Sequence, residues 1–228
     1  MKFFLQDSNS EQIDSILKSL NKLMDGDVSH QMKQKGLEYK LNYGASILWL
    51  RQLSNKFKGN NELANRLWLR EIRETMILAT LIIDPQKDTT NVIQEWLENI
   101  PTNEMAEQLG TNTLWKLDHI NSTCNKMLQS NDNFQKAAAW VAFATFLQRG
   151  KQLTDLEIEQ LINQITSDLQ NNSPFMLRVK GRFLRQLCRY SETYLNKVEN
   201  MIDELESNHI APWLTEDVKT EITFLKEK

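Results

Sequence analysis

Four arginines near the C-terminal third of the chain form the clearest candidate binding group, namely Arg178, Arg182, Arg185 and Arg189. Their spacing of four, three and four residues places them on one stripe of an α-helix, here called the arginine row. Like charges at this spacing repel, so the row requires counter-charges on a neighbouring helix or outside the protein. Guanidinium groups match the geometry of phosphate oxygens. The row therefore indicates a surface that binds phosphates.

Acidic residues offer a structural alternative for the same row. Between Asn171 and Ser191 the chain has no acidic residue, whereas from Glu192 to the end nine acidic residues face four basic ones. Glu157, Glu159 or these C-terminal acids would then pair with the arginines. The sequence leaves the two interpretations open, with phosphate binding slightly favoured.

Two carboxylates are the candidate groups for catalysis. Glu104 and Glu107 lie three residues apart in the segment TNEMAEQLG, shortly after Pro101. Pro101 predicts that a helix begins here, and acidic side chains in a first turn complement the helix dipole. This structural role alone explains their presence, so a catalytic role needs further support.

Other catalytic and metal-binding patterns are missing from the sequence. The three histidines, at positions 30, 119 and 209, are scattered, and Cys124 and Cys188 do not have ligand spacing. No serine–histidine–aspartate set can be proposed, and no glycine-rich phosphate loop occurs. We therefore expect no metal and no cofactor, and two reduced thiols in or near the core. Any catalysis would depend on carboxylates and electrostatics.

The elements that must position these residues are helices. The chain of 228 residues has only seven glycines and four prolines, too few for the turns of a strand-rich domain. Apolar residues recur at helical spacing almost throughout, which predicts an all-α fold of about a dozen helices. Ser8 or Ser10 is the expected N-cap of the first helix. The predicted helical stretches are 13–23, 63–83, 92–97, 134–147, 153–169, 174–190, 192–206 and the residues from 215 onward.

Connections between the predicted helices are short, so consecutive helices should form antiparallel hairpins. Such pairs build either a compact bundle or a curved α-α superhelix of HEAT type with about six pairs. No linker rich in glycine, serine or proline interrupts the chain, which predicts one domain over residues 1–228. The longest apolar run, 76–83, is too short to cross a membrane, and no signal sequence is evident. We expect a monomer in the cytoplasm.

Positive charge is concentrated in two segments, although the net charge is only −3. One segment contains the arginine row. The other extends from Val28 to Asn60, where Glu38 is the single acid. Its basic residues are Lys33, Lys35, Lys40, Arg51, Lys56 and Lys58. Two such segments in a nearly neutral chain favour a polyanion as the partner.

The segment NELANRLWLREIRETMILATLIIDPQ, residues 61–86, resembles the DNA alkylation repair family, the AlkD-like HEAT-repeat DNA glycosylases. The family has a Leu-Ala-x-x-Leu-Trp helix, followed by a helix that contains Arg and Glu and ends in Asp-Pro. Trp96, the segment GRFLRQ and the final LTEDVKTEI helix extend the resemblance over roughly residues 30–225. The residues that match in the first block are Leu63, Ala64, Leu67, Trp68, Ile72, Arg73, Glu74, Ala79, Asp84 and Pro85.

This resemblance implies a curved stack of helix pairs that holds duplex DNA on a basic concave face. It also implies hydrolysis of the N-glycosidic bond of cationic alkylpurines, such as 3-methyladenine and 7-methylguanine. A cationic base is already a good leaving group, so the reaction mainly needs an anion that stabilises the developing positive charge on the sugar. The resemblance implies no metal and no cofactor.

The family's site residues are only partly present. Its Trp-Asp-x-x-Asp motif aligns with residues 103–107, so Glu107 occupies the catalytic aspartate position and Asn103 replaces the site tryptophan. A second site tryptophan aligns with Arg182, and a pair of arginines aligns with Gln135 and Lys136. Glu107 is thus the candidate catalytic residue. The candidate DNA-binding residues are Asn103, Glu104, Lys136, Arg178, Arg182, Arg185 and Arg189.

Three functions remain open from the sequence. The first is an alkylpurine glycosylase that uses Glu107. The second is a non-catalytic protein that binds duplex, damaged or branched DNA, because the basic residues are retained while the site aromatics are replaced. The third is a HEAT-type scaffold for protein interactions, which requires acidic side chains to cover the arginine row.

Overall fold

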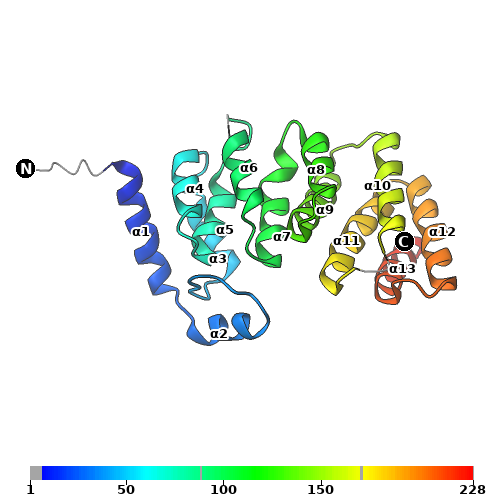
Figure 1. Cartoon of the computed structure of the whole chain (residues 1–228), viewed down its shortest axis with the longest axis horizontal. Helices are drawn as coiled ribbons and strands as arrows, with labels where there is room; N and C mark the ends of the chain where they lie inside the picture. The colour runs from blue at the N-terminus through cyan, green and yellow to red at the C-terminus, as the bar shows by residue number, and fades with distance from the viewer. Residues whose placement is uncertain (1–6, 88, 170–171, 228) are drawn as a thin grey trace, which may run out of the picture. The chain divides into compact units, whose positions relative to one another are not determined.

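A computed structural model describes residues 7–87, 89–169 and 172–227 (Figure 1). Over these residues it contains thirteen α-helices, one short 3₁₀-helix and no strand, with a single isolated bridge between Leu41 and Ile72. The predicted all-α fold is confirmed. No helix in the described part of the chain is long and apolar enough to span a bilayer.

Contacts along the chain divide it into two compact units, which meet in sequence between Asp118 and His119. The prediction of one domain over the whole chain stays a prediction. The first unit contains α1 (Ser8–Lys22), α2 (Gly26–Gln34), α3 (Ile47–Ser54), α4 (Asn61–Trp68), α5 (Arg73–Ile82), α6 (Thr90–Glu98), α7 (Asn103–Asn112) and the 3₁₀-helix η1 (Leu114–Lys116). The second contains α8 (Ile120–Leu128), α9 (Asn133–Gln148), α10 (Asp155–Ser167), α11 (Pro174–Tyr190), α12 (Glu192–Ser207) and α13 (Pro212–Lys226).

Within each unit the helices pack both with their neighbour in sequence and with the next helix but one. In the first unit α4 packs against α5, while α3, α5 and α7 stack in succession. In the second unit α8 packs against α9 and α12 against α13, while α9, α11 and α13 stack in succession. This pattern is that of HEAT-type repeats, in which every second helix belongs to the same layer. The candidate residues lie on helices of these stacked layers, on α7 in the first unit and on α9 and α11 in the second.

Two details of the predicted elements are corrected by the structure. The first helix is capped by Asp7, whose carboxylate accepts a hydrogen bond from Ser10 N at 2.8 Å, so Ser8 and Ser10 lie inside α1. The apolar stretch 63–83 is two helices, α4 and α5, because the turn between them places Glu71 in the left-handed region with φ 56°. A continuous apolar pattern conceals such a break, since both helices bury their apolar side chains in one core.

The core of the second unit is built around α9, which is buried on nearly all sides from Ala137 to Thr145. Phe183 of α11 packs against Trp140 and Phe143 of α9, with ring centroids 5.3 and 6.5 Å apart. Cys124 and Cys188 are free and buried, as expected. Burial raises the pKa of the Cys188 thiol to about 12 and that of Cys124 further, so neither is a reactive nucleophile near neutral pH.

Candidate nucleic-acid interface

The N-terminal half of the arginine row consists of Arg178 and Arg182, which differ in exposure. Arg178 is exposed, with its guanidinium 5.3 Å from the ring centre of Phe175 on the same helix. Arg182 is half-buried and donates a hydrogen bond from Nη2 to Thr145 Oγ1 of α9 at 3.2 Å. The opposite face of α11 is apolar and buried, as the spacing predicts, with Met176 among its core residues. The two arginines are therefore presented by a helix that is fixed from behind.

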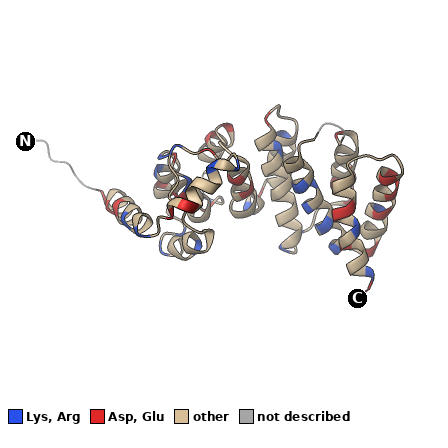
Figure 2. Cartoon of the chain, turned by 90° about the horizontal axis from the view of Figure 1, so that it is seen from below, with Lys and Arg blue, Asp and Glu red and all other residues tan. Residues whose placement is uncertain are grey.

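The C-terminal half of the row is paired with acidic residues of α13. Arg189 forms a bidentate ion pair with Glu221, in which Nε lies 2.7 Å from Oε1 and Nη2 lies 2.9 Å from Oε2. Arg185 pairs with Asp217. The C-terminal acids thus supply the structural counter-charge that the sequence left open. Figure 2 shows Asp and Glu beside Lys and Arg on the helices of this unit.

The two other acids considered as partners of the row have different partners. Glu157 completes the capping box of α10 with Thr154 and accepts a hydrogen bond from Asn121, whereas Glu159 pairs with Lys197. The carboxylates paired with Arg185 and Arg189 therefore come from α13.

Gly181 makes room for this pairing. A Cβ atom at position 181 would lie 2.9 Å from Asp217 Oδ2, closer than an ordinary contact. The glycine in the interior of α11, which costs about 0.5–1 kcal/mol relative to alanine, thus allows the carboxylate of α13 to approach the helix. The close neighbour of this glycine is therefore α13.

Lys136 adds a cation close to α11. It lies half-buried in the first turns of α9. Nearby, Lys180 of α11 is buried, with its ammonium 3.0 Å from the carbonyl oxygen and 3.3 Å from Oδ2 of Asp168. Burial, and also the charge of Lys136, lowers the pKa of Lys180. Lys180 therefore holds the end of α10, while Lys136 is the more accessible of the two cations.

The candidate residues of the first unit lie on α7. Thr102 caps this helix through a hydrogen bond from Met105 N, and Asn103 is exposed at its first position. Glu107 is half-buried one turn after Asn103. The structure thus brings Asn103, Glu104 and Glu107 together on one helix end and places Lys136 with the arginine row in the second unit.

Glu104 is held in an ion pair with the buried guanidinium of Arg73. Arg73 Nε and Nη2 donate to the two carboxylate oxygens of Glu104 at 2.8 and 2.6 Å, and the hydroxyl of Tyr39 donates at 2.9 Å. The guanidinium is 1% exposed and also donates to Ala45 O at 2.9 Å and to Glu74 at 2.8 Å. These contacts use both oxygens of Glu104, so its main role is to fix the N-terminal turn of α7.

Glu74 extends this buried polar cluster to the loop before α3. Its carboxylate is fully buried and accepts hydrogen bonds from the backbone N–H groups of Tyr43 and Ala45, at 3.0 and 3.2 Å. Burial alone would lower the pKa of Arg73, but the hydrogen bonds and charges of Glu104 and Glu74 outweigh it and raise the pKa. Burial and the charge of Glu104 also raise the pKa of Tyr39. The cluster therefore keeps its charges and connects the loop before α3 to α5 and α7.

From the sequence, Arg73 and Glu74 were identified only as matches to the family, and Tyr39 was not identified. A signal for the cluster was present: two adjacent charged residues begin a helix whose remaining residues are apolar or threonine. Charges in a fully buried helix require partners, and such partners come from elsewhere in the chain. Their identity depends on the fold and could not be read from spacing.

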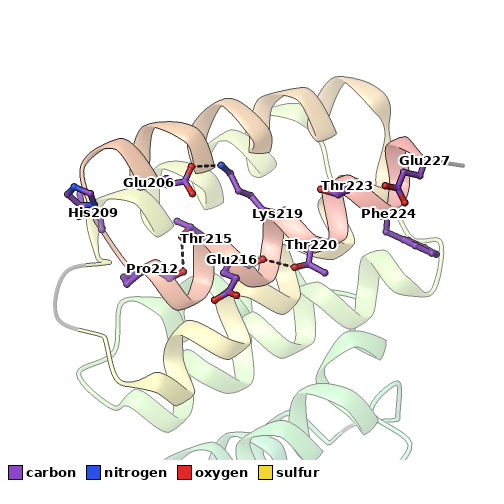
Figure 3. A pocket seen from close by; sticks show the side chains of 11 residues that line it. Glu206, His209, Pro212, Thr215, Glu216, Lys219, Thr220, Thr223, Phe224 and Glu227 are labelled. Atoms are coloured by element: carbon purple, nitrogen blue, oxygen red, sulfur yellow. Dashed lines mark hydrogen bonds and ion pairs between the residues drawn. The ribbon is translucent and has the colours of Figure 1, made fainter.

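A groove of about 720 Å³ lies between α12 and α13 at the C-terminal end of the second unit (Figure 3). Its lining includes Glu206, Glu216 and Glu227, with Lys219 reaching across to Glu206. An acidic lining repels nucleic acid, so this groove is not part of the candidate interface. No cluster of three potential metal ligands occurs among the described residues.

The fold places the chain among HEAT-like helical repeat proteins. A solved structure described as "a new family of proteins related to the HEAT-like repeat DNA glycosylases with affinity for branched DNA structures" is similar to it, with a TM-score of 0.76 and 15% sequence identity. The match covers 84% of this chain and 82% of that chain. At this identity the likeness concerns the fold. No curated protein matches the sequence.

The family follows from the sequence match. The model of the DNA alkylation repair enzyme family matches residues 16–216, most of the chain. The protein belongs to this family, so the resemblance inferred from residues 61–86 and the motifs around it is confirmed.

Proposed function

We propose that this protein binds DNA through Arg178, Arg182 and Lys136, and that branched DNA is its preferred form. The observation that carries the proposal is the position of Arg178, which lies exposed on the same stripe of α11 as Arg182, while ion pairs of Arg185 and Arg189 fix this helix against α13. Exposed guanidinium groups on a rigid helix suit phosphate oxygens. The remaining two arginines fix α11 against α13 instead of contacting the ligand.

Membership of the DNA alkylation repair family supports DNA as the ligand. The protein of related fold is described as having affinity for branched DNA structures, which supports a branched substrate for this chain as well. A binding function does not require the two site tryptophans, whose positions hold Asn103 and Arg182 here. Arg182 in place of an aromatic ring adds a cation to the surface that would face the phosphates.

The test compares DNA binding by the wild-type protein with that of the triple variant Arg178→Ala, Arg182→Ala, Lys136→Ala. Fluorescence anisotropy with a four-way junction, at several salt concentrations, measures affinity and its salt dependence. We expect weaker binding and a slope of log K against log salt that is smaller by about 2 to 3, because each lost phosphate contact removes about 0.9.

A matched triple variant controls for net charge. Lys197, Lys219 and Lys226 of the same unit pair with acidic residues of α10 and α12, so replacing them by alanine removes equal charge from another surface. The control should bind the junction nearly as the wild type does. Equal losses in the two triple variants would refute the assigned surface, and wild-type protein that binds no DNA would refute the function.

A second candidate function is hydrolysis of an N-glycosidic bond with Glu107 as the catalytic carboxylate. The observation in its favour is that Glu107 is half-buried on a helix whose first turn is fixed by the cluster of Arg73 and Glu104. In this reaction the C1′–N bond breaks, the base leaves with its electron pair, and water adds to C1′. A carboxylate fixed beside the sugar would stabilise its developing positive charge and orient the water.

Base release from methylated duplex DNA tests the catalytic role of Glu107. If the protein releases 7-methylguanine or 3-methyladenine, Glu107→Gln should lower the rate about a hundredfold, the usual scale for one electrostatic group in a preorganised site. Glu98→Gln, an exposed glutamate at the end of α6, is the control and should leave release unchanged. Release that persists in Glu107→Gln would exclude this role.

A further inference from the structure

The exposed face of α3 carries a second set of groups suited to nucleic acid, which the proposed function does not use. We propose that this surface binds unpaired bases of branched or single-stranded DNA, an inference that rests on the proposed function and extends it to the first unit. The α3 surface consists of Leu48, Trp49 and Arg51 on the helix and of Lys56 and Lys58 in the turn that follows it.

Two adjacent large apolar side chains of α3 are exposed. Leu48 is 66% exposed and Trp49 is 53% exposed, whereas Leu50 and Ser54 on the opposite face are buried. Trp68, Trp96 and Trp140 are nearly fully buried in the core. A large indole left in solvent next to an exposed leucine indicates a binding surface more often than a packing accident.

The cations of this surface are not neutralised by neighbouring acids. Arg51, Lys56 and Lys58 are exposed, and none of them forms an ion pair with a described residue. Lys40 of the same basic segment differs, because it pairs with Glu71 at 3.0 Å. On α3, Leu48 lies one turn before Arg51, and Lys56 and Lys58 lie in the turn that follows the helix. Apolar and basic groups are therefore neighbours on α3 and in the turn after it.

This combination favours single-stranded nucleic acid over a protein partner or intact duplex. Every base has a flat face that stacks on an indole, and a stacking aromatic beside cations is the usual device for binding unpaired nucleotides. Within intact duplex the bases are already stacked on one another, so only the cations of the α3 surface would contribute to binding it. Trp213 on α13 provides a contrast. It is 49% exposed, but its neighbours along the chain include the acidic groove residues Glu206 and Glu216.

The variant Trp49→Ala tests the stacking role. Anisotropy should show at least a fivefold loss of affinity for a forked oligonucleotide with single-stranded arms and little change for a duplex of equal length, from the usual cost of removing one stacking aromatic. Trp213→Ala, an equally exposed tryptophan in an acidic setting, should bind both as the wild type does. Both side chains are half-exposed, so thermal unfolding should confirm that the two variants remain folded.

A second variant isolates the cations of the α3 surface. Replacing Arg51, Lys56 and Lys58 by alanine should reduce the salt slope for single-stranded DNA by about 2, at about 0.7 for each contact. If wild-type protein binds forked DNA while both α3 variants bind it equally well, this inference is wrong and the proposed function stands. If wild-type protein binds no DNA, the proposed function fails first. Loss of forked and duplex binding alike in Trp49→Ala would also contradict the stacking role.

Discussion

Replacing Arg73 by methionine is expected to lower the free energy of unfolding by about 3–5 kcal/mol, the usual cost of removing one partner of a buried ion pair. Methionine replaces the aliphatic part of the arginine side chain but not the guanidinium, so Glu74, 0% exposed, and Glu104 are left without their cation. Glu74 would retain only the backbone N–H groups of Tyr43 and Ala45. Buried charge without a partner is costly, whereas the packing loss is small.

Urea unfolding followed by circular dichroism measures this loss, and Arg66→Ala is the matched control. Arg66 also pairs with two carboxylates, Asp7 and Glu62, but at the surface, so its removal should cost less than about 1 kcal/mol. Adding Glu104→Gln to Arg73→Met should recover part of the stability, because it removes one of the two stranded charges. Equal losses in Arg73→Met and Arg66→Ala would show that the buried cluster contributes no more than a surface pair.

Helices with strong local signals were predictable, whereas α2, α3 and α8 were not among the predicted stretches. Pro174 after Ser173 predicted the start of α11, and the apolar spacing predicted its buried face, both as found. The turn between α4 and α5 was not visible in the apolar pattern, since Glu71 adopts a left-handed conformation that its residue type does not indicate. The family resemblance alone implied two helices in this segment. Asp7 caps α1, where a serine was predicted. Aspartate and serine cap helices equally well, so residue type alone does not distinguish between them.

The candidate site was predictable only in part because its contacts join distant segments. The arginine row follows from spacing within one helix, but its pairing with Asp217 and Glu221 depends on how α13 stacks on α11. In the same way, the partner of Glu104 is Arg73, which precedes it by 31 residues. The exposure of Trp49 also depends on the fold, because apolar residues at helical spacing look the same whether a neighbour covers them or not.

The ion pairs between α11 and α13 bear on how the arginine row is held. Asp217 and Glu221 of α13 pair with Arg185 and Arg189. These two ion pairs anchor α11. Because the helix is already fixed, binding through Arg178 and Arg182 would not need to order it first. The position of α11 against α9 therefore matters both for stability and for the proposed DNA surface.

Replacing Phe183 by alanine is expected to lower the free energy of unfolding by about 3–5 kcal/mol, the range found when a buried aromatic side chain is truncated. Phe183 is fully buried and packs on Trp140 and Phe143, which lie on the most buried helix of the second unit. Large rigid rings cannot collapse into the space that remains, so a cavity should persist between α9 and α11. Urea unfolding monitored by tryptophan fluorescence measures the loss.

Two further variants separate the cavity from other effects of the Phe183 substitution. Phe183→Leu retains most of the buried volume and should cost distinctly less than alanine. Leu156→Ala on α10, where the leucine is 68% exposed, should change the free energy of unfolding by no more than about 0.5 kcal/mol. Because Arg182 is adjacent to Phe183 in sequence and contacts Thr145 of α9, Phe183→Ala should also weaken DNA binding in proportion to the loosening of α11. A stability loss no larger than that of Leu156→Ala would mean that the aromatic contact does not hold α11 in place.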